Sequence, residues 1–135
     1  MIKDGTFGKL SLAQKNLVLD RIRNEIKGRM MEDIILLETK LANPQMEVFA
    51  YHFDIGEFDM VVFDPRLAVC SIYEIKHSTE VVEAQYQHLM DEQKCRETEF
   101  NYGPIVGKYV IYRGQTCEVN DIQYVNVEEY LKALA

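Results

Sequence analysis

The sequence lacks several features that would place the chain in a membrane or outside the cell. It has no apolar run long enough to span a bilayer, and its N-terminus has no charged-then-apolar signal pattern. Its three cysteines, Cys70, Cys95 and Cys117, form no C-x-x-C pair and have no histidine at a spacing that suits zinc. We therefore expect a cytoplasmic chain that makes no membrane contact and keeps its thiols reduced.

Basic residues are also in the minority. The chain has 15 Lys and Arg against 22 Asp and Glu, which leaves a formal net charge of -7. Modules dedicated to DNA binding are usually basic, because much of their affinity comes from the release of counterions from phosphate. The chain therefore does not hold DNA by itself, or groups its basic residues locally, or relies on a partner or on another part of a longer chain.

What is present is the composition of an ordinary globular domain. Hydrophobic residues make up 47% and charged residues 27% of the 135 positions. This length is enough for one domain with a buried core. We predict a single domain over 1–135, in which an N-terminal helical segment, 1–27, precedes a core, 28–135.

The order of helical and strand-like segments predicts an α/β fold. Apolar periodicity predicts helices over 12–27, 29–41, 80–97 and 127–134, and strands over 47–53, 58–63, 67–75, 105–112 and 123–126. The second helix has an apolar stripe that consists of Met30, Ile34, Leu37 and Leu41, with Met31 and Ile35 beside it. This order favours a central mixed β-sheet flanked by helices over a helical bundle or a β-sandwich.

A compact turn centred on Pro65 joins two of the apolar strands, so we expect these strands to pair antiparallel. In the register that follows, Asp59 lies opposite Ile72, and Glu57 lies opposite Glu74. Side chains two apart along a strand share a face. Asp59 and Glu74 would then be diagonal neighbours, about 7–8 Å apart at the backbone.

The side chains of Glu57, Asp59, Glu74 and Lys76 would share this face at one end of the hairpin. Two converging carboxylates can share a divalent cation, and oxygen ligands suit Mg²⁺ or Mn²⁺. Such a metal polarises a phosphoryl oxygen and lowers the pKa of a bound water. A nearby lysine can orient that water and stabilise negative charge. The pattern therefore predicts phosphodiester hydrolysis, with an ordinary strand-end ion pair between Glu74 and Lys76 as the open alternative.

These residues resemble the motifs of the PD-(D/E)xK nuclease superfamily, with Asp59 as the first acid and Glu74-Ile75-Lys76 as the E-x-K motif. More narrowly, residues 25–134 are similar to the nuclease-like C-terminal domain of many archaeal and bacterial AAA-type ATPases. The segments that carry this similarity are GRMMEDIILLETKL, GEFDMVVF, IYEIKHS, VIYRG and YVNVEEYLKAL.

The resemblance implies a restriction-endonuclease-like core and a catalytic site that binds Mg²⁺ or Mn²⁺. The implied metal ligands are Asp59, Glu74 and the helical Glu32. Lys76 would assist catalysis, and further candidates are His77, Gln85 and Gln87. The implied partners are nucleic acid, with DNA favoured, and an AAA-type ATPase module in the same or a longer chain. The alternative is a non-catalytic domain that binds nucleic acid or a partner protein and regulates such an ATPase.

Overall fold

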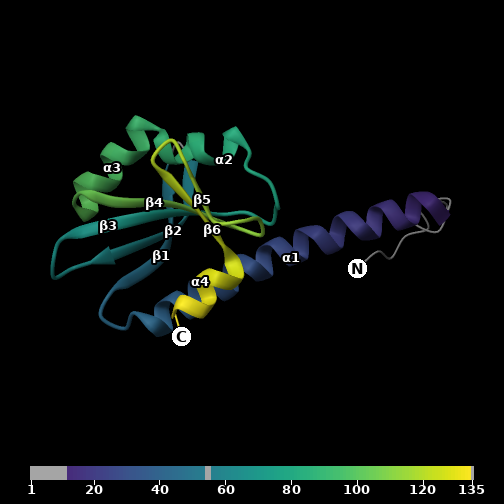
Figure 1. The fold of residues 1–135 in the computed structure, drawn as a ribbon, viewed down its shortest axis with the longest axis horizontal. Helices are drawn as coiled ribbons and strands as arrows, with labels where there is room; N and C mark the ends of the chain where they lie inside the picture. The colour runs from purple at the N-terminus through teal and green to yellow at the C-terminus, as the bar shows by residue number, and fades with distance from the viewer. Residues whose placement is uncertain (1–11, 54–55, 135) are drawn as a thin grey trace.

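A six-stranded mixed β-sheet forms the centre of the fold (Figure 1). The computed structural model describes residues 12–53 and 56–134, so the first eleven residues of the predicted N-terminal segment lie outside it. The strands are β1 (Glu47–Phe53), β2 (Gly56–Asp64), β3 (Val69–Ile75), β4 (Ile105–Tyr112), β5 (Cys117–Val119) and β6 (Ile122–Asn126). They lie in the order β1-β2-β3-β4-β6-β5, and the pairs β3–β4 and β4–β6 are parallel. The predicted α/β class with a mixed sheet is confirmed.

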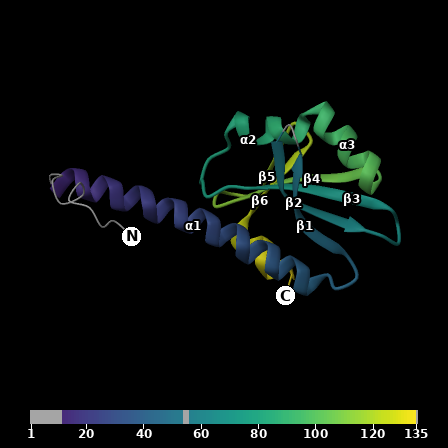
Figure 2. The ribbon, with the colours of Figure 1, turned by 180° about the vertical axis from the view of Figure 1, so that it is seen from behind.

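Helices cover both faces of this sheet. They are α1 (Leu12–Ala42), α2 (Glu83–Gln87), the 3₁₀ helix η2 (His88–Met90), α3 (Glu92–Tyr102) and α4 (Val127–Leu134). Figures 1 and 2 show α1 and α4 on one face, α2 and α3 on the other, and the N-terminal part of α1 extending beyond the sheet. Within the described ranges, no helix combines the length and the apolar character that a bilayer crossing requires.

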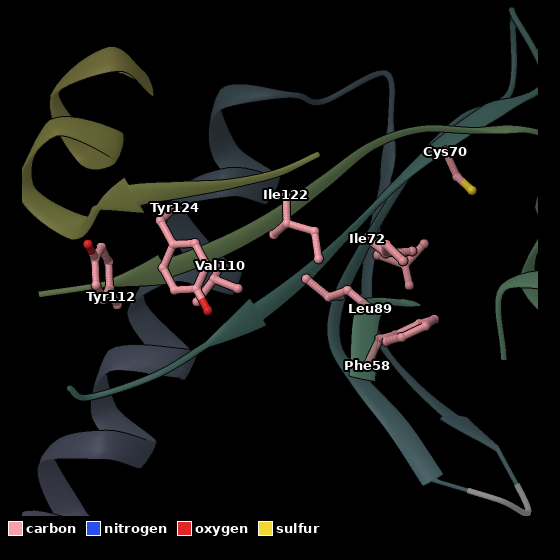
Figure 3. Packing of buried hydrophobic residues seen from close by; sticks show 9 residues of the cluster. Phe58, Cys70, Ile72, Leu89, Val110, Tyr112, Ile122 and Tyr124 are labelled. Atoms are coloured by element: carbon pink, nitrogen blue, oxygen red, sulfur yellow. The ribbon is translucent and has the colours of Figure 1, made fainter. Parts of the chain in front are cut away.

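The larger part of the core lies between the sheet and the layer formed by α2, η2 and α3, and Figure 3 shows the buried side chains of this cluster. Its buried members on β6, Ile122 and Tyr124, are two positions apart, because alternate side chains of a strand point to the same face. Leu89 of η2 packs against this face. The full cluster is Phe58, Val61, Cys70, Ile72, Leu89, Val110, Tyr112, Ile122 and Tyr124.

The smaller part of the core lies under α1, and it corrects the predicted apolar stripe. The four residues of that stripe are 46–67% exposed, whereas Ile35 is fully buried and Met31 packs beside it. Thr39 is also buried, and its hydroxyl is 2.7 Å from the Tyr130 hydroxyl of α4. Hydrophobicity alone selected the wrong stripe, because the buried side of the helix includes the polar Thr39. The hydrogen bond of Thr39 offsets the free-energy cost of burying its hydroxyl group.

Two further local features differ from the sequence prediction or are missing from it. The predicted helix over 80–97 is broken, because Asp91 caps a new helix by accepting hydrogen bonds from the backbone N–H groups of Gln93 and Lys94. Strand β5 was not predicted. It forms a hairpin with β6 through Asn120 and Asp121, which both have positive φ, as a two-residue turn of type I′ requires.

The position of α1 on the sheet predicts different effects of two adjacent substitutions. Ile35→Ala removes a fully buried side chain and should lower the free energy of unfolding by about 2–5 kcal/mol. Ile34→Ala, at a residue that is 46% exposed, should lower it by about 1 kcal/mol or less. Denaturant unfolding of both variants measures the difference. Equal losses would contradict the observed orientation of the helix.

Candidate functional site

Strand β2 contains an extra residue next to the predicted first acid. Between the pairs Phe49–Val61 and Tyr51–Phe58, β1 advances by two residues while β2 advances by three. The extra residue therefore lies in the short stretch of β2 that includes Asp59. Such bulges bend a strand and re-aim its side chains, and they are common beside functional sites.

The pairing of β2 with β3 differs from the predicted register by two residues. One step beyond the last paired residues, Asp59 stands opposite Glu74, whereas the prediction set it opposite Ile72. The connecting turn, 65–68, holds four residues and has Ala68 in the left-handed region, so its centre lies later than predicted. An even shift keeps each side chain on its face, and it makes the two carboxylates direct neighbours instead of diagonal ones.

A backbone hydrogen bond fixes the Asp59 carboxylate at the end of β3. The N–H of Lys76 donates to the carbonyl oxygen of Ile111 on β4 at 2.9 Å. Because successive N–H groups of a strand point to opposite neighbours, the N–H of Ile75 points toward β2. There it donates to Asp59 Oδ2 at 2.8 Å, so that a side-chain oxygen takes the place of a strand carbonyl.

Lys76 lies beside both acids. Its Nζ is 3.4 Å from Glu74 Oε2 and 3.9 Å from Asp59 Oδ2. The side chains of Glu74 and Asp59 are 4% and 9% exposed, and that of Lys76 is 36% exposed. Two buried carboxylates therefore meet one ammonium group that is still open to solvent.

The environment of Glu74 strongly favours its protonated form. Burial raises the pKa of Glu74, and the charge of Asp59 and a hydrogen bond with Asp59 raise it further, to about 8, against the opposing effect of Lys76. In the absence of a bound cation, this carboxyl group is therefore protonated more readily than that of an ordinary glutamate. One ammonium does not neutralise two buried carboxylates, and a divalent cation could replace the proton.

Asp59, Glu74 and Lys76 line a pocket of about 230 Å³, which we call the acid–lysine pocket. Its lining residues are Gly56, Glu57, Asp59, Glu74, Lys76, His88 and Lys94. The sequence prediction did not include Lys94 or His88. Lys94 belongs to α3 and is 3% exposed, four residues before the buried Thr98. The sequence signal for Lys94 would have been its spacing of four residues from Thr98, which places both residues on the buried side of an otherwise polar helix.

Glu32 approaches from α1, which covers the opposite face of the sheet. Burial raises its pKa first, and the charge of Asp59 raises it further, while Lys76 lowers it. Glu32 is therefore close enough to interact electrostatically with Asp59 and Lys76. Even so, residues 12–53 and 56–134 contain no group of three or more His, Cys, Asp or Glu side chains arranged to hold a metal ion.

The other candidates have local roles. His77 lies against α1, where the position of a Cβ on Gly28 would be 3.9 Å from the His77 Cβ. Gln85 donates to the Ser78 hydroxyl at 2.9 Å, and Gln87 bonds within its own helix. None of these three candidates lines the acid–lysine pocket.

No protein-family model matches the chain, and no curated protein or solved structure matches it. The resemblance to PD-(D/E)xK nucleases therefore stays a prediction. The geometry of the acid–lysine pocket carries the functional inference.

The raised pKa of Glu74 predicts a stability that falls with rising pH in the presence of a chelator. The folded protein holds this proton up to about pH 8, whereas the unfolded chain releases it near the ordinary glutamate value of 4.5. Between these values the folded state binds more protons, so the free energy of unfolding decreases as pH rises. One pKa unit corresponds to about 1.4 kcal/mol, so we expect a total decrease of more than about 1 kcal/mol.

Denaturant unfolding at several pH values within this window measures the effect. Glu74→Gln is the matched control, because it keeps the size of the side chain and cannot titrate. Its stability should depend less on pH than that of the wild type. Equal slopes for the two proteins would assign the effect to other groups.

Proposed function

We propose that the chain is a nuclease-like domain with a restriction-endonuclease-like core that hydrolyses phosphodiester bonds in DNA with Mg²⁺ or Mn²⁺. The observation that carries this proposal is the convergence of Asp59, Glu74 and Lys76 at the ends of two paired strands. The mixed sheet with helices on both faces is compatible with such a core.

The donor atoms of the pocket fit a hard divalent cation. Asp59 and Glu74 offer carboxylate oxygens, and Mg²⁺ in proteins is commonly held by one or two carboxylates while water and substrate phosphate complete its coordination. Glu32 would add negative charge from the α1 side. When bound, the cation would polarise a phosphoryl oxygen and acidify a water molecule.

The protein's own groups have distinct tasks in this proposal. The hydrogen bond from the Ile75 N–H holds the Asp59 carboxylate in place before any ligand arrives. Lys76, which is still open to solvent, would orient the attacking water and stabilise negative charge that develops on the phosphoryl oxygens. Such preorganised charge acts more strongly in a partly buried pocket than in water.

Lys76→Ala tests this role. We expect the variant to stay folded and to bind Mn²⁺ in calorimetry, while its rate of DNA cleavage falls by about 100-fold or more because the charge beside the reacting phosphate is lost. Lys40→Ala, at an exposed residue in the last turn of α1, removes the same charge away from the pocket and should cleave like the wild type.

Asp59→Asn should abolish Mn²⁺ binding, since it removes one of the two ligand charges. A wild-type protein that binds neither Mg²⁺ nor Mn²⁺ and cleaves no DNA would contradict the proposed activity.

A second candidate function is a non-catalytic domain that binds nucleic acid or a partner protein and regulates an AAA-type ATPase. The net charge of -7 and the exposed apolar stripe of α1 favour it. In that case the binding of nucleic acid or of a partner protein should persist in a chelator and in the Asp59→Asn variant. The nuclease proposal requires instead that the chelator and the substitution each reduce metal-dependent binding.

A further inference from the structure

A second lysine enters the acid–lysine pocket from helix α3. Lys94 is 3% exposed, and it lines the same pocket as Asp59 and Glu74. In the described part of the chain, however, Lys94 forms no ion pair with a carboxylate, whereas Lys76 pairs with both acids. A buried ammonium group without a carboxylate partner destabilises the folded protein, so burial of Lys94 beside the pocket does not serve stability.

The contacts of Lys94 hold the ammonium group in place and leave donors available. Its Nζ lies 5.6 Å from the centre of the Phe58 ring and 3.2 Å from His88 Nδ1. An ammonium group has three N–H donors, and the histidine nitrogen accepts one of them. Among the residues that the structure describes, His88 is the one hydrogen-bond partner of this Nζ.

Gly56 provides a second, independent observation at the same point. It has φ of +145°, a conformation that favours glycine, and it lines the pocket. A Cβ at this position would lie 2.7 Å from Lys94 Nζ and 2.8 Å from its Cε. The absence of a side chain at Gly56 therefore makes room for the Lys94 ammonium group. A larger residue at position 56 would displace Lys94 from the pocket.

We propose that Lys94 binds a non-bridging oxygen of the nucleic-acid phosphate in the acid–lysine pocket. This inference rests on the proposed nuclease function and adds a substrate-binding residue to it. The carboxylates and Lys76 would act on the attacking side of the phosphate, and Lys94 would neutralise an oxygen from the α3 side. A volume of about 230 Å³ is several times the ~30 Å³ of one water, so the pocket has room for a phosphate group and its bound cation.

A purely structural role for Lys94 makes opposite predictions. If the ammonium only neutralised the carboxylates, its removal would lower the stability of the protein along with its activity. If it binds phosphate, its removal relieves an unpaired buried charge in the ligand-free protein. Lys94→Met separates the two roles, because methionine keeps an apolar stem beside Phe58 and carries no charge.

We expect Lys94→Met to bind Mn²⁺ at least as tightly as the wild type and to unfold at the same or a higher denaturant concentration. Its kcat/KM for DNA cleavage should fall by about 10- to 100-fold, as expected for a lost charged hydrogen bond. Arg96→Met is the matched control, because Arg96 lies on the solvent side of the same helix with its side chain 79% exposed. Its kcat/KM should stay within about twofold of the wild type.

The outcomes distinguish this inference from the proposed function. If the wild type binds no metal and cleaves no DNA, both fail. If the wild type cleaves DNA and Lys94→Met has an unchanged kcat/KM, the inference alone is overturned. A loss of both stability and Mn²⁺ binding in a folded Lys94→Met variant would assign a structural role and would also overturn it.

Lys94→Gln repeats the test if the methionine variant does not fold. The glutamine amide can still donate a hydrogen bond to His88, but it carries no charge for the phosphate. The same fall in kcat/KM is expected, and a value equal to that of the wild type would overturn the inference.

Discussion

The hydrogen bond from the Ile75 N–H to Asp59 Oδ2 is the interaction on which the site depends. It occurs where β2 has an extra residue, so the regular ladder between β2 and β3 ends and a side chain completes it. The sheet thereby obtains a partner for a backbone donor near its centre. The same hydrogen bond holds the Asp59 carboxylate beside Glu74. Asp59 Oδ2 therefore contributes both to the stability of the sheet and to the geometry of the site.

This arrangement places two acids where burial opposes their charge. The pKa of Glu74 rises to about 8 because the carboxyl group is buried next to Asp59, and Lys76 offsets only part of that effect. A strand end that served stability alone would not need this pair, since buried like charges destabilise the folded state. In the proposed function, a bound cation would remove this repulsion. Without a ligand, the protein should thus be less stable than a variant of the same fold that lacks this pair of acids, a trade-off that is common at functional sites.

The sequence was informative where local rules decide the structure. Strands β1 and β4 and helix α4 occupy the predicted ranges 47–53, 105–112 and 127–134. Face alternation along β2 and β3 was enough to bring Asp59 and Glu74 together even though the register was wrong, because the error was an even number of residues. The register itself depends on turn geometry, and a left-handed Ala68 is not a recognisable sequence signal.

Tertiary packing decided the features that sequence reasoning missed. Thr39 rather than an apolar neighbour faces the sheet because Tyr130, 91 residues away, provides a hydrogen bond. Lys94 was missed for a related reason: a lysine in a polar helix is normally solvated, and its burial depends on the space that Gly56 leaves on a different strand.

The positions of the charged groups also explain how an acidic chain could act on an anionic polymer. The net charge of -7 opposes a broad electrostatic grip on DNA, and long-range attraction would be weak. Two positive side chains, Lys76 from the end of β3 and Lys94 from α3, nevertheless lie beside the acids of the acid–lysine pocket. Charge in a partly buried pocket acts at short range and is screened little by salt. Under the proposed function, such a site would suit a domain that a partner delivers to its substrate better than a domain that searches DNA by itself.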